Sequence, residues 1–348
     1  MMMGANSAPK PPLNSAPKST SASPAIMSTP SAHITVLLNE AVDALNIKPG
    51  GTYIDGTFGR GGHSKKILSK LDSFGLENVE LQSAGRLFAM DRDLAAIETG
   101  KQIQDARFCI EHLHFSEINQ LAINHSLASV DGILLDLGIS SPQIDEGERG
   151  FSFRFDGPLD MRMDQTRGKT VAELLTTISE QQLGKVIKDY GEERFAKQVA
   201  RAIIKERTDG RAITTTGQLA KVVASAIPKV EPGQNPATRT FQALRIFVNQ
   251  ELEELSLVLP QCLNLLAAGG RLVVISFHSL EDRVVKRFIQ SEENRDDLPA
   301  NFPIKAKDLP QARLHSVGRA IKPSANEIKQ NVRARSAVMR VAERTAVL

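Results

Sequence analysis

The sequence predicts an α/β protein built on a doubly wound, mostly parallel sheet, with a helical domain inserted into it. Short apolar runs alternate with helix-length segments through the first part of the chain. The alternation stops after Pro142, and a helical pattern continues until one further strand-like run near residue 271. A glycine-rich turn directly follows the first run, which is where such sheets bind ligands.

The sheet is predicted from short apolar runs, each of which ends in polar residues or a turn. A short amphipathic segment at 36–45 precedes them. The predicted strands are 52–55, 86–91, 107–111, 130–136 and 271–277. The run 334–341 is predicted to form an edge strand.

The helical part predicts the domain organisation. Its clearest segments are 178–190, 192–207 and 216–226, followed by one long helix at 238–266 that returns to the sheet. We therefore expect a sheet domain at 33–144 and 238–348, and an inserted helical domain at 145–237. Residues 1–32 are rich in Ser, Pro, Ala and Thr and are expected to be a disordered extension.

Composition predicts a soluble protein of the cytoplasm. The 348 residues are 41% hydrophobic and 24% charged, and the sequence contains no apolar run long enough to cross a membrane. Cys109 and Cys262 lack metal-ligand spacing and suit a reducing compartment, so no metal is expected. The net charge is only +3, but the window 192–245 holds ten Lys/Arg against five Asp/Glu.

The turn after the first strand predicts an adenosyl cofactor. It reads Asp55-Gly56-Thr57-Phe58-Gly59-Arg60-Gly61-Gly62-His63. Its spacing is not the G-x-G-x-x-G of dinucleotide enzymes, and the carboxylate of Asp55 would repel a pyrophosphate while tolerating a cationic methionyl group. At the end of the second strand, Asp91 can accept both hydroxyls of a ribose. These features together favour S-adenosylmethionine over a plain turn with a capping aspartate.

Other residues at this edge have open alternatives. His63 begins the following helix and could contact the cofactor's carboxylate or cap the helix. Asp136 ends the fourth strand, and Gln143 lies one turn further on, where an amide could contact cofactor or base. For Phe115, core packing is favoured over stacking on adenine.

The segment from Asp136 to Gln143 is interpreted as the loop that binds the methyl acceptor. The lone pair of an exocyclic base amine is delocalised into the ring, so an enzyme needs hydrogen-bond acceptors for its N–H groups rather than a strong base. Asp136, the Ser141 hydroxyl and the carbonyl at Pro142 are the candidate catalytic groups. The alternative is a Ser-Pro turn with no chemistry.

Aromatic and basic residues further along predict RNA contacts. Phe151 and Phe153 alternate with arginines and could stack on an extruded base, or could anchor the inserted domain to the core. Arg194, Lys197 and Arg201 recur at helical spacing, with Lys205 continuing the row, and form either a phosphate-binding face or an ordinary solvated one.

The chain resembles a known family, the bacterial small-subunit ribosomal RNA cytosine-N4 methyltransferases of the RsmH type, formerly called MraW. The resemblance covers almost everything after residue 32. It rests on the motifs His33-Ile34-Thr35-Val36-Leu37-Leu38, Tyr53 to Ser64, Ser140 to Gln143, Phe151 to Asp164, Tyr190 to Ala196, Pro236 to Arg245 and Ile275 to Arg283.

The resemblance implies a methyltransferase-type sheet at 33–144 and 238–348 with an inserted substrate-recognition domain at 145–237. It also implies methylation of N4 of a cytidine in the decoding region of 16S rRNA. It implies cofactor contacts from Gly61, Gly62, His63, Asp91, Phe115, Asp136 and Gln143, which reverses the preference for Phe115 as a core residue. Related amino-methyltransferases have an aromatic residue soon after the proline, whereas this chain has Gln143 and Ile144. We hypothesise that Phe151 or Phe153 replaces it.

Some assignments stay open from sequence. His278 and Glu281 follow the fifth strand and either line the acceptor pocket or cap the next helix. The leading partner is small-subunit rRNA; no membrane partner is expected, and an oligomer is left open. The competing functions are a nicotinamide-dependent oxidoreductase, which wants another glycine spacing, and an RNA-binding ribosome-assembly factor without turnover.

Overall fold

The computed structural model describes Met1 and residues 34–72, 85–229, 233, 235–294 and 311–346. Residues from His33 to Leu348 form one compact unit. The predicted disordered extension, apart from Met1, lies outside the described residues. In the described part of the chain, no helix is long and apolar enough to span a membrane. Cys109 and Cys262 are both free thiols.

Among the described residues, seven strands form one sheet in the order β3-β2-β1-β4-β5-β7-β6. Strands β1 to β5 pair in parallel, whereas β7 runs antiparallel to both β5 and β6. The strands are β1 Thr52–Asp55, β2 Arg86–Asp91, β3 Phe108–His112, β4 Val130–Asp136, β5 Leu266–Ser276, β6 Leu314–Ser316 and β7 Val338–Arg344. The predicted fold class, an α/β protein with a mostly parallel sheet, is confirmed.

The ends of the sheet differ from the sequence prediction. Strand β5 begins at Leu266, five residues earlier than expected, and its register against β4 shifts between Val130 and Gly132. The predicted edge strand is β7, which lies inside the sheet because β6 pairs along its outer side. Strand β6 has only three residues, too few for an alternating pattern to show in the sequence.

The helices flank the sheet or gather in a separate group. The helices near the sheet are α1 Leu38–Ala44, α2 Gly62–Asp72, α3 Leu94–Gly100, α4 Ile118–Asn124, α11 Glu251–Leu265 and α12 Ser279–Glu293. The others are α5 Ser141–Asp145, α6 Val171–Thr177, α7 Glu180–Gly191, α8 Ala196–Thr208, α9 Thr216–Ala226, α10 Thr238–Val248 and α13 Ala325–Gln330. Short 3₁₀ turns are η2 Phe115–Glu117, η3 Gly147–Arg149 and η5 Val332–Ser336.

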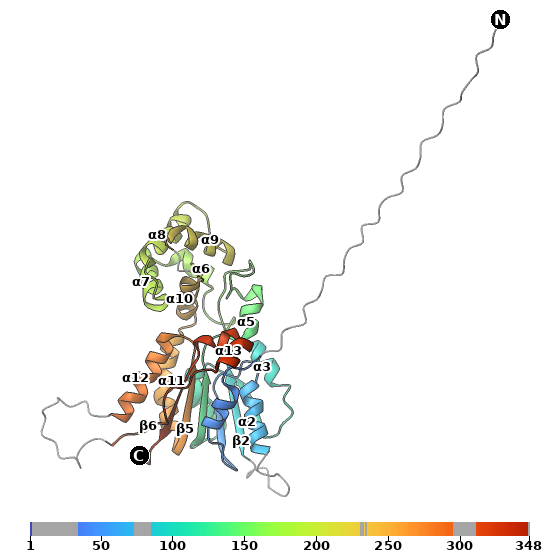
Figure 1. Ribbon diagram of the computed structural model, residues 1–348, viewed down its shortest axis with the longest axis vertical. Coiled ribbons are helices and arrows are strands. Elements are labelled where there is room, and N and C mark those ends of the chain that lie inside the picture. The colour runs from blue at the N-terminus through green and yellow to red at the C-terminus, as the bar shows by residue number, and fades with distance from the viewer. Residues whose placement is uncertain (2–33, 73–84, 230–232, 234, 295–310, 347–348) are drawn as a thin grey trace, which may run out of the picture. The chain divides into compact units, whose positions relative to one another are not determined.

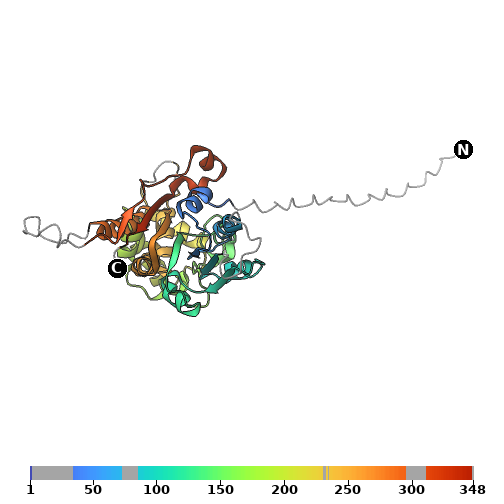
Figure 2. The same ribbon diagram turned by 90° about the horizontal axis from the view of Figure 1, so that it is seen from below.

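Both faces of the sheet are covered, as Figures 1 and 2 show. Successive strand residues point to opposite faces, so Ile133 packs in the cluster with Leu121 of α4 and Leu259 of α11. On the other face, Leu134 packs with Ile67 of α2. These two apolar layers fix the strand ends, and therefore the loops that follow them.

Helices α6 to α10 gather in one group (Figure 1) and share a hydrophobic cluster that includes Leu183, Val199, Leu219 and Leu244. The group joins the sheet at the start of α12, where Ser279 donates a hydrogen bond to Glu192 (Oγ to Oε2, 3.0 Å). Helix α10 belongs to this cluster although it lies after residue 237. The proposed domain boundaries themselves stay a prediction.

The single long helix predicted for residues 238–266 is wrong, because the chain breaks between α10 and α11. Gln250 has a left-handed backbone (φ 50°). Next to it, the Asn249 side-chain amide donates to the Met161 carbonyl and accepts from the Met163 amide, both at 2.7 Å. The Asn249 carbonyl accepts from the Arg92 guanidinium (2.9 Å). These bonds to distant segments fix the break, and local sequence preference does not reveal them.

Candidate active site

A cleft opens where β1, β2 and β4 end, at the carboxyl edge of the sheet. Its walls come from the glycine-rich turn, the end of β2, the loop after β4 and the segment that directly precedes β7. The residues that line it are Ile34, Thr35, Val36, Gly56, Thr57, Phe58, Gly59, Arg60, Gly62, His63, Asp91, Arg92, Asp93, Ala96, Phe115, Asp136, Leu137, Gly138, Ile139, Ser140, Ser141, Gln143, Met163, Glu251, Phe277, Glu281, Asn331 and Arg333. A concave site at this edge is the expected ligand position in an open parallel sheet.

The glycine turn is shaped by close packing. Gly61 has a left-handed backbone (φ 74°), and a Cβ there would lie 2.5 Å from the Phe58 ring. A Cβ on Gly62 would overlap the Thr35 hydroxyl, which lines the cleft. Of the two glycines, Gly62 lines the cleft directly, whereas Gly61 shapes the turn behind it. The bare backbone leaves room for a ligand at the start of α2.

Asp91 is oriented by two backbone amides. Its Oδ2 accepts from the Gly59 amide and its Oδ1 accepts from the Asp93 amide, both at 2.8 Å. Burial raises the pKa of Asp91, while those two hydrogen bonds act in the opposite direction. Each carboxylate oxygen keeps a further lone pair. The carboxylate is therefore pre-positioned to accept two hydroxyl groups from a ligand in the cleft.

Asp55 lies behind the turn rather than in the cleft. It is 1% exposed, accepts from the Ser64 hydroxyl (2.7 Å) and accepts from the Thr57 amide (3.1 Å). Burial raises the pKa of Asp55 to about 6. The carboxylate ties the turn to α2, so its predicted direct influence on a charged ligand is replaced by a structural role.

Asp136 presents an unsatisfied polar atom in the cleft. Its Oδ1 is buried and makes no hydrogen bond to any residue that the structure describes. Its Oδ2 lies 3.5 Å from the Nδ1 of His63, the buried second residue of α2. Burial, followed by the charges of Asp55 and Glu281, raises the pKa of Asp136 well above its usual range. Such a group is expected to bind a donor from a ligand.

Phe115 and Gln143 line the same cleft. Phe115 starts η2, is 8% exposed, and has the Arg92 guanidinium 5.7 Å from its ring centre. The Gln143 amide donates to Asp93 (Nε2 to Oδ2, 2.7 Å), and its Oε1 accepts from the Ser140 amide (2.9 Å). Gln143 therefore fixes the loop after β4 as well as lining the cleft.

The loop after β4 has a partner that the sequence did not suggest. Arg333 of η5 donates hydrogen bonds to the Ser141 hydroxyl and to Asp145 (Nη2 to Oδ1, 2.7 Å). Ser141 and Arg333 both line the cleft, whereas Pro142 lies in the first turn of α5 and does not. Arg333 is 192 residues from Ser141, and no local motif could have indicated this contact.

The residues predicted to bind RNA lie outside the cleft. Phe151 is buried in the cluster of the α6–α10 group, and Phe153 packs edge-on against Phe241 with ring centres 5.0 Å apart. Arg194, Lys197 and Arg201 are exposed just before and along α8. The exposed aromatic of this segment is Phe155, which the sequence reading passed over.

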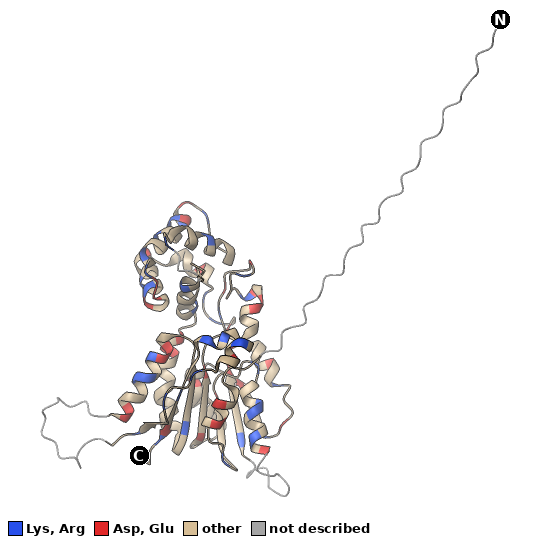
Figure 3. Cartoon of the chain, in the orientation of Figure 1, with Lys and Arg blue, Asp and Glu red and all other residues tan. Residues whose placement is uncertain are grey.

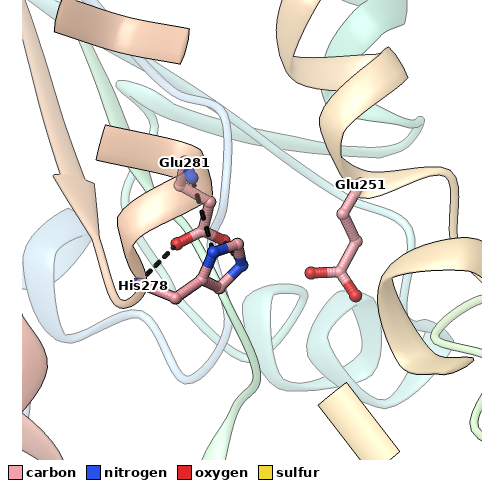
Figure 4. Close-up of side chains that lie close together, drawn as sticks. All are labelled: Glu251, His278 and Glu281. Atoms are coloured by element: carbon pink, nitrogen blue, oxygen red, sulfur yellow. Dashed lines mark hydrogen bonds and ion pairs between the residues drawn. The ribbon is translucent and has the colours of Figure 1, made fainter. Parts of the chain in front are cut away.

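His278 and Glu281 occupy the start of α12, and Figure 4 shows them facing Glu251. His278 caps the helix by accepting from the Glu281 amide (3.4 Å), and Glu281 accepts from the Phe277 amide (2.7 Å). Burial favours a raised pKa for Glu281, but hydrogen bonding and charge from His278, with the charge of Arg245, hold it below the usual value. Glu281 lines the cleft.

The three side chains Glu251, His278 and Glu281 have potential ligand atoms within 4.8 Å of one another, but their bonding does not favour a metal ion. Glu251 is held by Arg245 through two hydrogen bonds of 2.9 Å. His278 is engaged as well, because its Nδ1 takes part in the cap of α12 and its Nε2 lies 3.2 Å from Glu281 Oε1.

The strand order with an antiparallel β7, together with a cleft at the carboxyl edge, defines the class: this is a class I methyltransferase, whose cofactor is S-adenosylmethionine. The cleft suits that cofactor, because Asp91 is set for two hydroxyls and Asp136 has a buried oxygen with no partner among the described residues.

Comparison with known proteins then identifies the family. The model of the MraW methylase family matches residues 30–345, and the chain belongs to that family. A protein from Methylobacillus flagellatus, named ribosomal RNA small subunit methyltransferase H, is 68% identical over 91% of this chain and 96% of its own length. A protein of the same name from Azoarcus sp. is 57% identical over 92% of this chain and 99% of its own. The resemblance found in the sequence is confirmed.

Among solved structures, a putative rRNA methylase from Clostridium thermocellum aligns with 89% of this chain and 98% of its own, at 13% identity and a TM-score of 0.40. A likeness this weak decides nothing about the fold, which rests on the strand order and pairing described above.

Proposed function

We propose that this enzyme transfers the methyl group of S-adenosylmethionine to N4 of a cytidine in the decoding region of small-subunit (16S) rRNA. The observation that carries the proposal is the Oδ1 of Asp136, which has no hydrogen-bond partner in the described part of the chain and belongs to the same cleft as the glycine turn and Ser140–Ser141. The relatives' printed names support small-subunit rRNA as the substrate class. The expected compartment is the cytoplasm, where ribosomal subunits are assembled.

The cofactor contacts follow from the two ends of the cleft. Asp91 accepts the ribose hydroxyls, and Phe115 lies against the adenine. At the other end, the turn at Gly61 and Gly62 with the α2 amino terminus and His63 binds the methionyl carboxylate. Gln143 acts mainly through the loop that it holds. When bound, S-adenosylmethionine supplies an electrophilic methyl group.

The acceptor side orients an amine and receives a proton. In the overall reaction a bond forms between the cytidine N4 and the methyl carbon, the carbon–sulfur bond breaks, and N4 loses one proton. Asp136 accepts one N–H of the amine through Oδ1, and a second acceptor comes from Ser141 or the carbonyl at Pro142. The raised pKa of Asp136 suits it to take up the released proton before passing it to water.

Outer contacts to RNA are assigned to two groups. Phe153, which is half-buried, and Phe151, which is buried in the cluster of the α6–α10 group, stay the candidates for stacking on the extruded cytosine, although neither lines the cleft. The exposed cations Arg194, Lys197 and Arg201 are candidates for phosphate contacts.

The test is transfer of tritium from labelled S-adenosylmethionine to small ribosomal subunits from a strain that lacks the modification. Digestion of the RNA to nucleosides and chromatography then separates N4-methylcytidine from its ring-methylated isomer. We expect the N4 product with wild type and a loss of at least 100-fold with Asp136→Ala, while Glu98→Ala on the exposed face of α3 keeps the wild-type rate. Absence of transfer by a folded wild type that binds cofactor would instead favour an assembly factor.

A further inference from the structure

A second cavity adjoins the cleft, and we propose that it binds the phosphodiester backbone of the substrate RNA beside the target base. This proposal rests on the proposed function and adds the path of the strand. The groove has a volume of about 660 Å³. Its lining comes from the loop after η3, the end of α7, the start of α10, the start of α12 and η5, and includes Phe153, Arg154, Glu192, Arg239, His278 and Arg335.

The charge of the groove suits a polyanion. Arg154, Arg239 and Arg335 line it, and the side chains of Arg154 and Arg335 are exposed and form no ion pair within the part of the chain that the structure describes. Figure 3 shows basic residues at and next to α13, the helix that precedes η5 in the chain. A concave surface lined by charges of one sign concentrates the potential felt by a phosphate.

Among the described residues that line the groove, Glu192 is the one acid, and its carboxylate is already engaged. Glu192 accepts from the Ser279 hydroxyl (3.0 Å) and from Arg283 (Nη2 to Oε1, 3.2 Å). Among the described lining residues, the charge that faces a ligand is therefore set by Arg154 and Arg335, beside Arg239, which has an interaction partner of its own. These contacts also join the end of α7 to the start of α12 and keep the two walls of the groove together.

The groove and the cofactor cleft are separated by a thin wall. At the start of α12, His278 lines the groove and Glu281, one helical turn further, lines the cleft. Along η5, Arg335 lines the groove and Arg333 lines the cleft. A strand whose cytosine enters the cleft would therefore leave its adjacent phosphates at the groove.

RNA fits this surface better than an acidic protein segment does. Phe153 and Arg154 both line the groove, and aromatic residues among arginines are the usual arrangement for binding single-stranded nucleic acid. In the row on α8, Arg201 already lies 3.6 Å from Glu180. The geometry thus assigns the strand next to the base to the groove and leaves α8 for more distant contacts.

The experiment measures anisotropy of a short fluorescein-labelled single-stranded RNA at several salt concentrations. The groove variant is Arg154→Gln with Arg239→Gln and Arg335→Gln. The comparison variant removes Arg194, Lys197 and Arg201 in the same way, and a matched control removes the exposed cations Lys65, Lys185 and Arg287 of α2, α7 and α12. Calorimetric binding of S-adenosylmethionine shows that each variant is folded.

The expected result is a smaller salt dependence for the groove variant. Each lost phosphate contact lowers the slope of log K against log salt by about 0.7, so three arginines lower it by about 2. Between about 50 and about 200 mM salt, wild type should lose about 20-fold more affinity than the groove variant. The matched control should stay within about threefold of wild type.

Three results would overturn the proposal. The first is RNA affinity within threefold of wild type in a groove variant that still binds cofactor. The second is that the whole loss of RNA affinity appears in the α8 variant instead of the groove variant. The third is that polyglutamate competes for binding as well as RNA does, with the same dependence on the three arginines. RNA binding through the groove by a protein that transfers no methyl group would support the groove and refute the proposed function.

Discussion

Replacing Asp91 with alanine tests whether the end of β2 holds the ribose of the cofactor. In the structure the Asp91 carboxylate is fixed by the amides of Gly59 and Asp93 and keeps one lone pair on each oxygen. Two hydrogen bonds to a charged group are worth about 1.5–3 kcal/mol each, and we take the lower value because the cleft is open to water. The loss is about 3 kcal/mol, or roughly 100-fold in Kd for S-adenosylmethionine.

Isothermal titration calorimetry measures this loss directly. The variant also leaves the Gly59 and Asp93 amides without their acceptor, so we expect a lower Tm, and titration must be done well below it. Glu98→Ala on the exposed face of α3 is the matched control for removal of an acid, and its affinity should not change. A folded Asp91→Ala protein with a Kd within threefold of wild type would refute the reasoning.

Three other predictions concern the turn, the C-terminal contact and the aromatic pair. The pKa of Asp55, about 6 in the folded state, lies above its ordinary value of 3.8, so the stabilisation from its protonated form is complete below about pH 4 and is lost as pH rises through about 6. Asp55→Asn should therefore gain up to about 3 kcal/mol relative to wild type between pH 4 and pH 7 in urea unfolding, and a pH-independent difference would contradict this. Arg333→Ala should slow methyl transfer, since it frees the Ser141 side chain. The free energy of unfolding should change by less than about 1 kcal/mol, because the Arg333 side chain is 36% exposed and its partner Asp145 is 53% exposed, so water screens the pair. Unchanged initial rates would remove Arg333 from the site. Phe151→Ala should destabilise the fold by about 3 kcal/mol and Phe153→Ala by less, whereas undiminished transfer to intact subunits by the double variant, assayed below its Tm, would exclude both as stacking residues.

Most of the sheet could be predicted because its strands carry their own signal. Strands β1, β2 and β4 have the predicted bounds, since each is an apolar run that ends at an aspartate. The break at Asn249 could not be predicted, because Asn249 is held there by Met161, Met163 and Arg92 from other parts of the chain. A helical pattern in sequence cannot reveal such distant partners.

The cleft was predicted in outline for the same reason. Strand ends place Asp91, Asp136 and the glycine turn together whatever the loops do. The hydrogen-bond partners of the individual side chains could not be predicted from the sequence. Asp55 accepts a hydrogen bond from Ser64, and Arg333, near the C-terminal end of the chain, donates one to Ser141. Both contacts depend on how separate segments of the chain pack together, and no local sequence pattern predicts that packing.

The break at Asn249 has a practical consequence for exchanging the helical segment between relatives. A junction placed at residue 237 would separate α10 from helices that share its hydrophobic cluster. It would also split Asn249 from the 161–163 stretch that its amide holds. A chimera that keeps residues 145–250 as one cassette retains the cluster and these bonds, and it cuts the chain at the left-handed Gln250, where the helix is already interrupted.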